Sequence, residues 1–261
     1  MEIDSNFKKD IPEESVPYGL QVSNEYFKKI VETKKIYQLS ILVIISFLTS
    51  YTPYGRLVNS WIGDMNEILK PIVGALFFIA PITISFVFIF FKQRALLFKR
   101  VTIKLYKKSW FYALCIIGVL LFVLLGVTSI SSYQPNSNPI YGSGYLSVLL
   151  KLPGMAIQLI GENLMFVSFL LFGYKTIQNV LSRSSILLGY SFLFAGLCFG
   201  LLHLPTYNFD WMQCVFVIGI PAISQMIFFV RFQNVHLGYL MHLNYDLLII
   251  AIALVGAILS S

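Results

Sequence analysis

The amino-acid sequence predicts an all-α protein that crosses a membrane as a bundle of about seven helices, with six to eight spans possible. Only 12% of its 261 residues are charged, whereas 57% are hydrophobic, and the mean hydropathy is +0.76. Soluble domains usually carry about 25% charged residues, so this composition favours a bilayer as the solvent. The apolar residues form long runs without the strict alternation of a half-buried strand, which favours helices.

Seven apolar runs account for the predicted spans. They cover residues 37–55, 70–91, 110–130, 153–173, 186–204, 212–230 and 234–257. A run of about 17–25 residues crosses the ~30 Å hydrocarbon core as a helix. A charged segment precedes the first run, which is not the arrangement of a cleaved signal peptide. We therefore expect a cytosolic tail at 1–36 with a surface helix, N-terminal spans at 37–130 and a core of further spans at 131–261.

The basic residues predict the orientation of the chain. Of its 19 Lys and Arg residues, 16 fall in the tail, in the loops 92–108 and 174–185, and at position 231. The three on the other side are Arg56, Lys70 and Lys151. By the positive-inside rule this bias predicts a cytosolic N-terminus and an external C-terminus, with the polar stretch 131–144 as an external loop. Basic residues beside a bilayer predict contact with anionic lipid rather than with nucleic acid.

The ionisable residues of the second half single out a candidate site. Nine of the twelve acidic residues precede residue 68, and the others are Glu162, Asp210 and Asp246. A charge at bilayer depth costs about 2.5–3.5 kcal/mol on insertion scales and normally faces a bundle interior or a wet cavity. Glu162 lies nine residues inside its span, so we expect it to face partners from other spans. Asp210 instead suits the first turn of a span, with Trp211 as an interfacial anchor.

Spans five and seven contain the candidate partners. His203 ends the stretch "FGLLH", and His242 and Asp246 are four residues apart on one helix face. His203 lies near the external end of its predicted span, whereas His242 lies near the cytosolic end of its own. We therefore expect the four residues to meet only if span five is displaced, tilted or broken near Pro205.

These side chains suit two kinds of chemistry. A carboxylate beside a neutral imidazole can deprotonate a water molecule, and a second imidazole can stabilise the oxyanion formed when that water attacks an amide. The same ligand types can bind zinc, although no HExxH sequence is present. The spacing does not decide between the two. On the last span, Tyr239 shares the face of the candidate residues and Asn244 points away.

Three ordered motifs resemble signatures of the CPBP family, which comprises CAAX proteases and bacteriocin-processing (Abi) enzymes. The family pattern Glu-Glu-x-x-x-Arg has its counterpart in "ENLMFV" at 162–167. The pattern Phe-x-x-x-His is matched by "FGLLH" at 199–203, and His-x-x-x-Asn or Asp is matched by "HLNYD" at 242–246.

The resemblance implies an intramembrane glutamic endopeptidase that needs no cofactor. In it, Glu162 and His203 would activate water, and His242 and Asp246 would form the oxyanion side of the site. The substrate would be a peptide or a membrane protein, at the cell membrane of a Gram-positive bacterium. Family roles include bacteriocin self-immunity and peptide processing.

Departures from the family pattern leave a second function open. Asn163 and Val167 replace the second Glu and the Arg of the first motif, so both members of a possible ion pair are missing. An ionised Asp246 cannot donate a hydrogen bond to an oxyanion, so it would have to be protonated or orient His242. The alternative is a catalytically silent membrane protein that binds or regulates a partner. A transporter is disfavoured, because no inverted repeat or pair of broken helices is visible.

Overall fold

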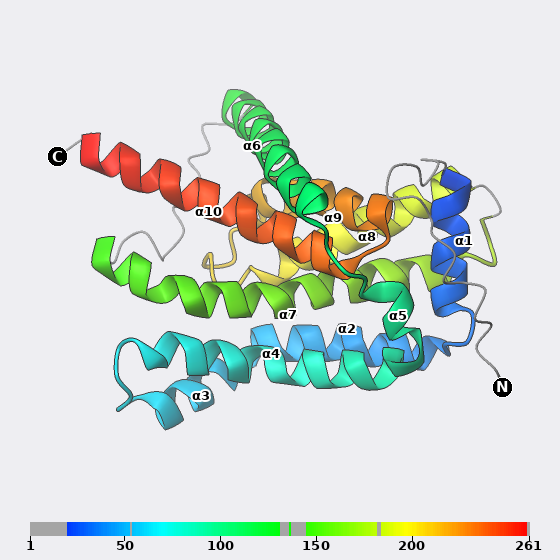
Figure 1. The fold of residues 1–261 in the computed structure, drawn as a ribbon, viewed down its shortest axis with the longest axis horizontal. Coiled ribbons are helices and arrows are strands. Elements are labelled where there is room, and N and C mark those ends of the chain that lie inside the picture. Colours follow the sequence, from blue (N-terminus) through cyan, green and yellow to red (C-terminus); the bar gives the residue numbers. More distant parts are fainter. Residues whose placement is uncertain (1–19, 53, 131–135, 137–144, 182–183, 260–261) are drawn as a thin grey trace.

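The computed structural model describes residues 20–52, 54–130, 136, 145–181 and 184–259, and every regular element in these ranges is a helix (Figure 1). Six helical stretches are long and apolar enough to cross a membrane, and α2 is a shorter apolar helix. The elements are α1 (Leu20–Val31), α2 (Ile36–Tyr51), α3 (Tyr54–Ile62), α4 (Leu69–Phe90), η2 (Phe91–Gln93), α5 (Arg94–Leu97), α6 (Ile103–Ile130), α7 (Tyr145–Ile177), α8 (Ser184–Leu202), η4 (Gln213–Gly219), α9 (Ile220–Phe232) and α10 (Val235–Leu259). The predicted all-α membrane bundle is therefore confirmed.

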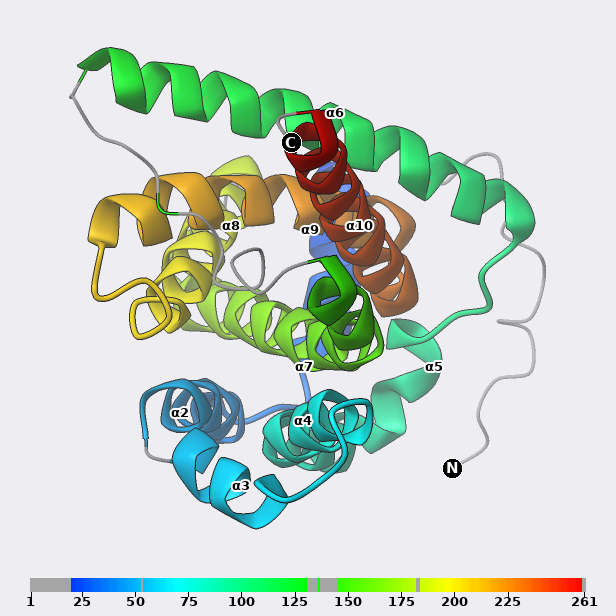
Figure 2. The same cartoon turned by 90° about the vertical axis from the view of Figure 1, so that its left-hand side faces the viewer.

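The long helix α7 forms the centre of the bundle. Figure 2 shows α2 and α4 on one side of it and α8, α9 and α10 on the other, with α6 outermost. Within its most apolar stretch 67% of residues are buried, against 11% for α6. Residues 164–171 are apolar apart from Ser168 and all are buried, as expected for a helix with neighbours on every side. Glu162 lies just before this stretch, so the core positions it.

Helix α1, in the predicted tail, packs against the end of the bundle. Phe27, Ile30 and Val31 are fully buried. The hydroxyl of Tyr26 donates to the backbone oxygen of Leu96 at 3.1 Å, and burial raises the pKa of this phenol. The tail helix is thus part of the folded core rather than a separate surface helix.

The two ends of the bundle differ as the charge bias predicts. Figure 1 places α1 and α5 at one end, and α3, the start of α7 and the C-terminus at the other. The end that carries α1 also carries the basic loop around residues 92–102. The orientation itself stays a prediction. The predicted external loop 131–144 lies outside the described residues except for Asn136.

Helix α8 ends at Leu202, and this early end positions His203. The chain then makes a series of turns through residue 209. Pro205 has no backbone N–H to continue a helix. Asn208 and Phe209 reverse the chain with positive φ angles of 52° and 61°. The helix of span five therefore ends at Leu202, two residues before its predicted end, and His203 lies in the turns that follow.

The next helix begins at Trp211, where Asp210 acts as its N-terminal cap. The Oδ1 atom of Asp210 accepts a hydrogen bond from the backbone N–H of Gln213 at 3.1 Å. This agrees with the predicted first-turn position of Asp210.

The helix continues as the π-helix η4, which packs closely on α8. A Cβ at Gly200 would overlap the backbone oxygen of Cys214, so the two helices cross with backbone in contact.

Candidate active site

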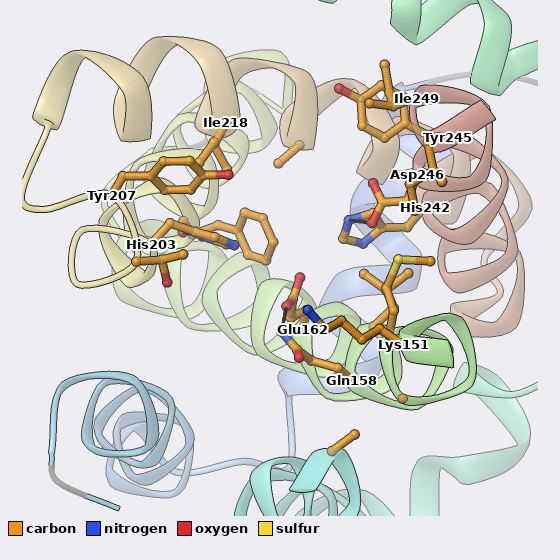
Figure 3. Close-up of a pocket in the computed structure, with 18 of the residues that line it drawn as sticks. Lys151, Gln158, Glu162, His203, Tyr207, Ile218, His242, Tyr245, Asp246 and Ile249 are labelled. Atoms are coloured by element: carbon orange, nitrogen blue, oxygen red, sulfur yellow. Dashed lines mark hydrogen bonds and ion pairs between the residues drawn. The ribbon is translucent and has the colours of Figure 1, made fainter. Parts of the chain in front are cut away.

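All four predicted residues line one cavity of about 970 Å³, which lies between α4, α7, the end of α8 and α10 and is also lined by residues of η4 and α9. Figure 3 shows the Glu162 side chain directed into it, with His203 on one side and His242 and Asp246 on the other. Ligand sites usually have volumes of about 300–1,000 Å³. The cavity is thus large enough for several residues of a peptide.

Glu162 is half-buried on α7 and is held by its own helix. Its Oε1 atom accepts a hydrogen bond from Nε2 of Gln158, one turn earlier, at 2.7 Å. Among the residues that the structure describes, Gln158 is the single hydrogen-bond partner of this carboxylate. The second carboxylate oxygen is therefore available to a water molecule or a substrate.

His203 has a defined tautomer because of its contact with Phe199. The Nδ1 atom lies 2.9 Å from the backbone oxygen of Phe199. A carbonyl oxygen only accepts, so Nδ1 must carry the proton, and the neutral ring then keeps Nε2 as an acceptor. The Phe199 ring contacts both imidazoles, with centroids 4.9 Å from His203 and 6.2 Å from His242. The phenylalanine of the second motif thus packs between the two histidines.

His242 and Asp246 lie one turn apart on α10 without a direct hydrogen bond. The Nε2 atom of His242 is 4.0 Å from Oδ2 of Asp246, which exceeds hydrogen-bond length. His242 is 6% exposed and, within the described ranges, has no hydrogen bond to protein. Both groups can therefore bind a ligand in the cavity.

The other polar residues of α10 have structural contacts. Asn244 donates to Oγ of Ser109 on α6 at 2.7 Å, so it points away from the cavity, as the helical projection predicts. Tyr239 donates to the backbone oxygen of Ala156 on α7 at 3.1 Å. Asn244 and Tyr239 therefore fix α10 between α6 and α7 and so position His242.

Asn163 and Val167, which depart from the first family motif, are both buried in the core. Asn163 is 1% exposed, and its Nδ2 atom donates to the backbone oxygen of Val235 at 3.2 Å, which joins α7 to the start of α10. Its Oδ1 atom is buried without a partner among the described residues. Val167 is fully buried among apolar side chains. Replacing a buried ion pair by apolar groups is often neutral for stability, so loss of the pair need not weaken the fold.

Asn163→Asp is expected to destabilise the protein by about 3–5 kcal/mol, because it places an unpaired carboxylate against the Val235 oxygen in the core. Asn163→Ala removes one hydrogen bond and the unpaired Oδ1 atom together, so its expected cost is only about 1 kcal/mol. Thermal unfolding of both variants in detergent measures the difference. Equal losses for Asp and Ala would show that Asn163 does not act through its amide.

Several cavity residues were not predicted from the sequence. They are Lys70, Lys151, Gln158, Tyr207, Gln225 and Tyr245. Lys151 and Gln158 precede Glu162 by eleven and four residues, which puts all three on one face of α7. That spacing is a signal that helical projection from Glu162 would have detected. Tyr207, Gln225 and Tyr245 gave no such signal, because they lie on other elements and a neutral Gln or Tyr is compatible with many environments.

The described residues contain no group of three or more His, Cys, Asp or Glu side chains arranged to hold a metal ion. The fold and the cavity define a polytopic helical membrane protein with a polar site inside its bundle. No family model matches the chain, and neither does a curated protein or a solved structure. The resemblance to the CPBP family therefore rests on the three sequence motifs and stays a prediction.

Proposed function

We propose that the protein is an intramembrane endopeptidase of the CPBP type, which hydrolyses a peptide or membrane-protein substrate with water activated by Glu162 and His203. One observation carries the proposal. Glu162 lies on α7, His203 in the turn that follows α8, and His242 and Asp246 on α10, and all four line one cavity. Most of their hydrogen-bonding capacity is unused by the rest of the described protein. Polar groups inside a bundle are costly, so such a convergence favours a functional site.

The proposed reaction begins with a water molecule between Glu162 and His203. The Glu162 carboxylate takes a proton from it, and Nε2 of His203 accepts its second hydrogen as a hydrogen bond. The water oxygen attacks the amide carbon, and the carbonyl oxygen becomes an oxyanion. His242 donates a hydrogen bond to that oxygen. The C–N bond then breaks, and the proton held by Glu162 passes to the leaving amine.

The cellular setting belongs to the same proposal. The bias of 16 basic residues against three favours an N-terminus in the cytosol. The resemblance favours the cell membrane of a Gram-positive bacterium, with a role in bacteriocin self-immunity or peptide processing. The expected partners are the substrate and the lipid bilayer, and nucleic acid is not among them.

A catalytically silent protein that binds or regulates a partner is the second candidate. Asn163 and Val167 favour it, because they remove the charged pair of the family's first motif. The carboxylate of Asp246 favours it as well, since it lacks the N–H of an Asn. In that case the cavity would bind its partner without hydrolysis.

Purified protein in detergent, incubated with a mixed library of internally quenched peptides, tests the proposal. We expect cleavage by the wild type and its loss in His203→Ala. The matched control is His236→Ala, because Nδ1 of His236 donates to the Lys99 backbone oxygen at 3.0 Å and His236 does not line the cavity. Loss of cleavage on adding a chelator would favour the zinc chemistry. No cleavage of any peptide would favour the silent partner-binding protein.

A further inference from the structure

Gln225 on α9 is a buried amide that lines the cavity. The residue is 4% exposed, and its side chain forms no hydrogen bond with the described part of the chain. Buried polar groups are normally hydrogen-bonded, so an unpaired amide needs an explanation. Gln225 differs from Asn163, whose orphan Oδ1 atom is enclosed by protein. Gln225 lines the cavity and its amide atoms are not among the enclosed unpaired atoms of the described residues, so the amide can be reached by a ligand in the cavity.

Gln225 on α9 and His242 on α10 lie near the contact between these two helices. The two helices pack against each other and are joined by a tight turn at Gln233 and Asn234. Gln225 lies eight residues before Gln233, and His242 lies eight residues after Asn234. Phe229 lies four residues after Gln225, Gly238 lies four residues before His242, and a Cβ at Gly238 would lie 3.2 Å from the Cβ of Phe229. Gln225 and His242 therefore each lie about one turn from a close contact of the two helices, and both line the cavity.

The cavity-facing side of this helix is continuous. Ile218, Ala222 and Gln225 are spaced by four and three residues, so they share one face, and all three line the cavity. Figure 3 shows Ile218 across the cavity from Glu162. Gln225 lies on the same wall, nearer to the hairpin turn. A substrate held against Glu162 would therefore have the α9 face on its other side.

An ionised Asp246 would leave the proposed reaction short of one donor. His242 has a single N–H to give to the oxyanion, and an ionised Asp246 has none, whereas the Asn of the family pattern would donate from its amide. We propose that Nε2 of Gln225 donates the missing hydrogen bond to the substrate oxygen that becomes the oxyanion. This inference rests on the proposed function. An amide stays neutral and keeps its donors at every accessible pH.

Kinetics on one quenched peptide that the wild type cleaves test this role. Gln225→Met keeps the length of the side chain but has no donor, and loss of one oxyanion donor typically lowers kcat by about 10²–10³-fold. We expect that loss with little change in KM. The matched control is Gln93→Met, a buried glutamine outside the cavity whose Nε2 donates to Thr33, and kcat should not change.

Gln225→Glu tests the donor role through the pH dependence of activity, which a purely structural role of Gln225 would not change. A carboxyl group donates only while protonated, so this variant should be active at low pH and lose activity as the pH rises through the pKa of the new group. Wild type and Gln225→Met should lack that step. Gel filtration and thermal unfolding check that both variants are folded.

The outcomes separate the two proposals. Unchanged kcat in Gln225→Met, with Glu162→Gln inactive, would overturn the role of Gln225 and leave the endopeptidase intact. A Gln225→Glu variant without the pH-dependent loss would also overturn it. If the wild type cleaves no peptide, both the endopeptidase and the donor role of Gln225 fail.

Discussion

Glu162→Gln is expected to lower peptide cleavage by about 10²–10⁴-fold, the range supplied by a positioned general base. The amide cannot take a proton from water, so the nucleophile is no longer activated. The fold should be retained, because the new amide is isosteric and its oxygen can still accept the 2.7 Å hydrogen bond from Gln158. The variant therefore separates the proton-accepting role of Glu162 from its contribution to packing.

Cleavage rates measured on purified protein at equal concentration check this expectation. The matched control is Asp64→Asn, which changes an exposed carboxylate of the α3–α4 connection that does not line the cavity. It should retain the wild-type rate. Full activity of Glu162→Gln would show that the water is activated by another group.

Gly200→Ala is expected to destabilise the protein by about 1–3 kcal/mol or more, the usual cost of overpacking. The added Cβ would overlap the backbone oxygen of Cys214 and lie 3.4 Å from the Cα of Val215. Backbone atoms cannot move aside as a flexible side chain can, so α8 must shift from η4. Because His203 follows three residues later, the shift should also lower activity.

Gly189→Ala on the same helix is the matched control. A Cβ at Gly189 would meet nothing within 4 Å. Alanine is favoured over glycine inside a helix by about 0.5–1 kcal/mol, so this variant should be slightly more stable than the wild type. Thermal unfolding in one detergent compares the two. Equal effects of the two substitutions would mean that α8 and η4 do not cross as closely as described.

The fold was largely predictable because the bilayer imposes simple rules on the sequence. Six of the seven predicted spans coincide with helical stretches long and apolar enough to cross a membrane, and the first coincides with the shorter helix α2. In lipid every backbone polar group must be paired within its own segment, which favours helices. The boundaries were less predictable. The first span was predicted to reach residue 55, but α2 ends at Tyr51, and the fourth extends at both ends to form α7. Apolar runs do not define where a helix continues into the interface.

The ionisable residues of the candidate site could be predicted from the sequence. Glu162, His203, His242 and Asp246 stand out because ionisable residues are rare in the spans, and the structure places all four around one cavity. Their roles stay predictions. The depth of His203 could not be predicted, because it depends on how the turns after Leu202 fold and on the contact of Gly200 with η4.

Gln225 was not predictable for a different reason. A neutral amide in an apolar span gives no electrostatic signal. Its importance appears only when its lack of a hydrogen-bond partner among the described residues is known. The packing of α1 against the bundle was not predicted for a similar reason, because the residues that it buries lie in a charged segment whose composition is typical of a solvent-exposed tail. Both features depend on tertiary contacts that local patterns do not contain.

The most direct test of the central claim is a comparison of peptide termini in cells that carry wild-type protein or Glu162→Gln at matched membrane levels. The proposed endopeptidase predicts a set of termini that appear with the wild type and disappear with the variant, and these termini would identify the substrate. Identical termini in both cells, with the biological phenotype retained, would contradict proteolysis and leave Glu162 as a binding or structural carboxylate.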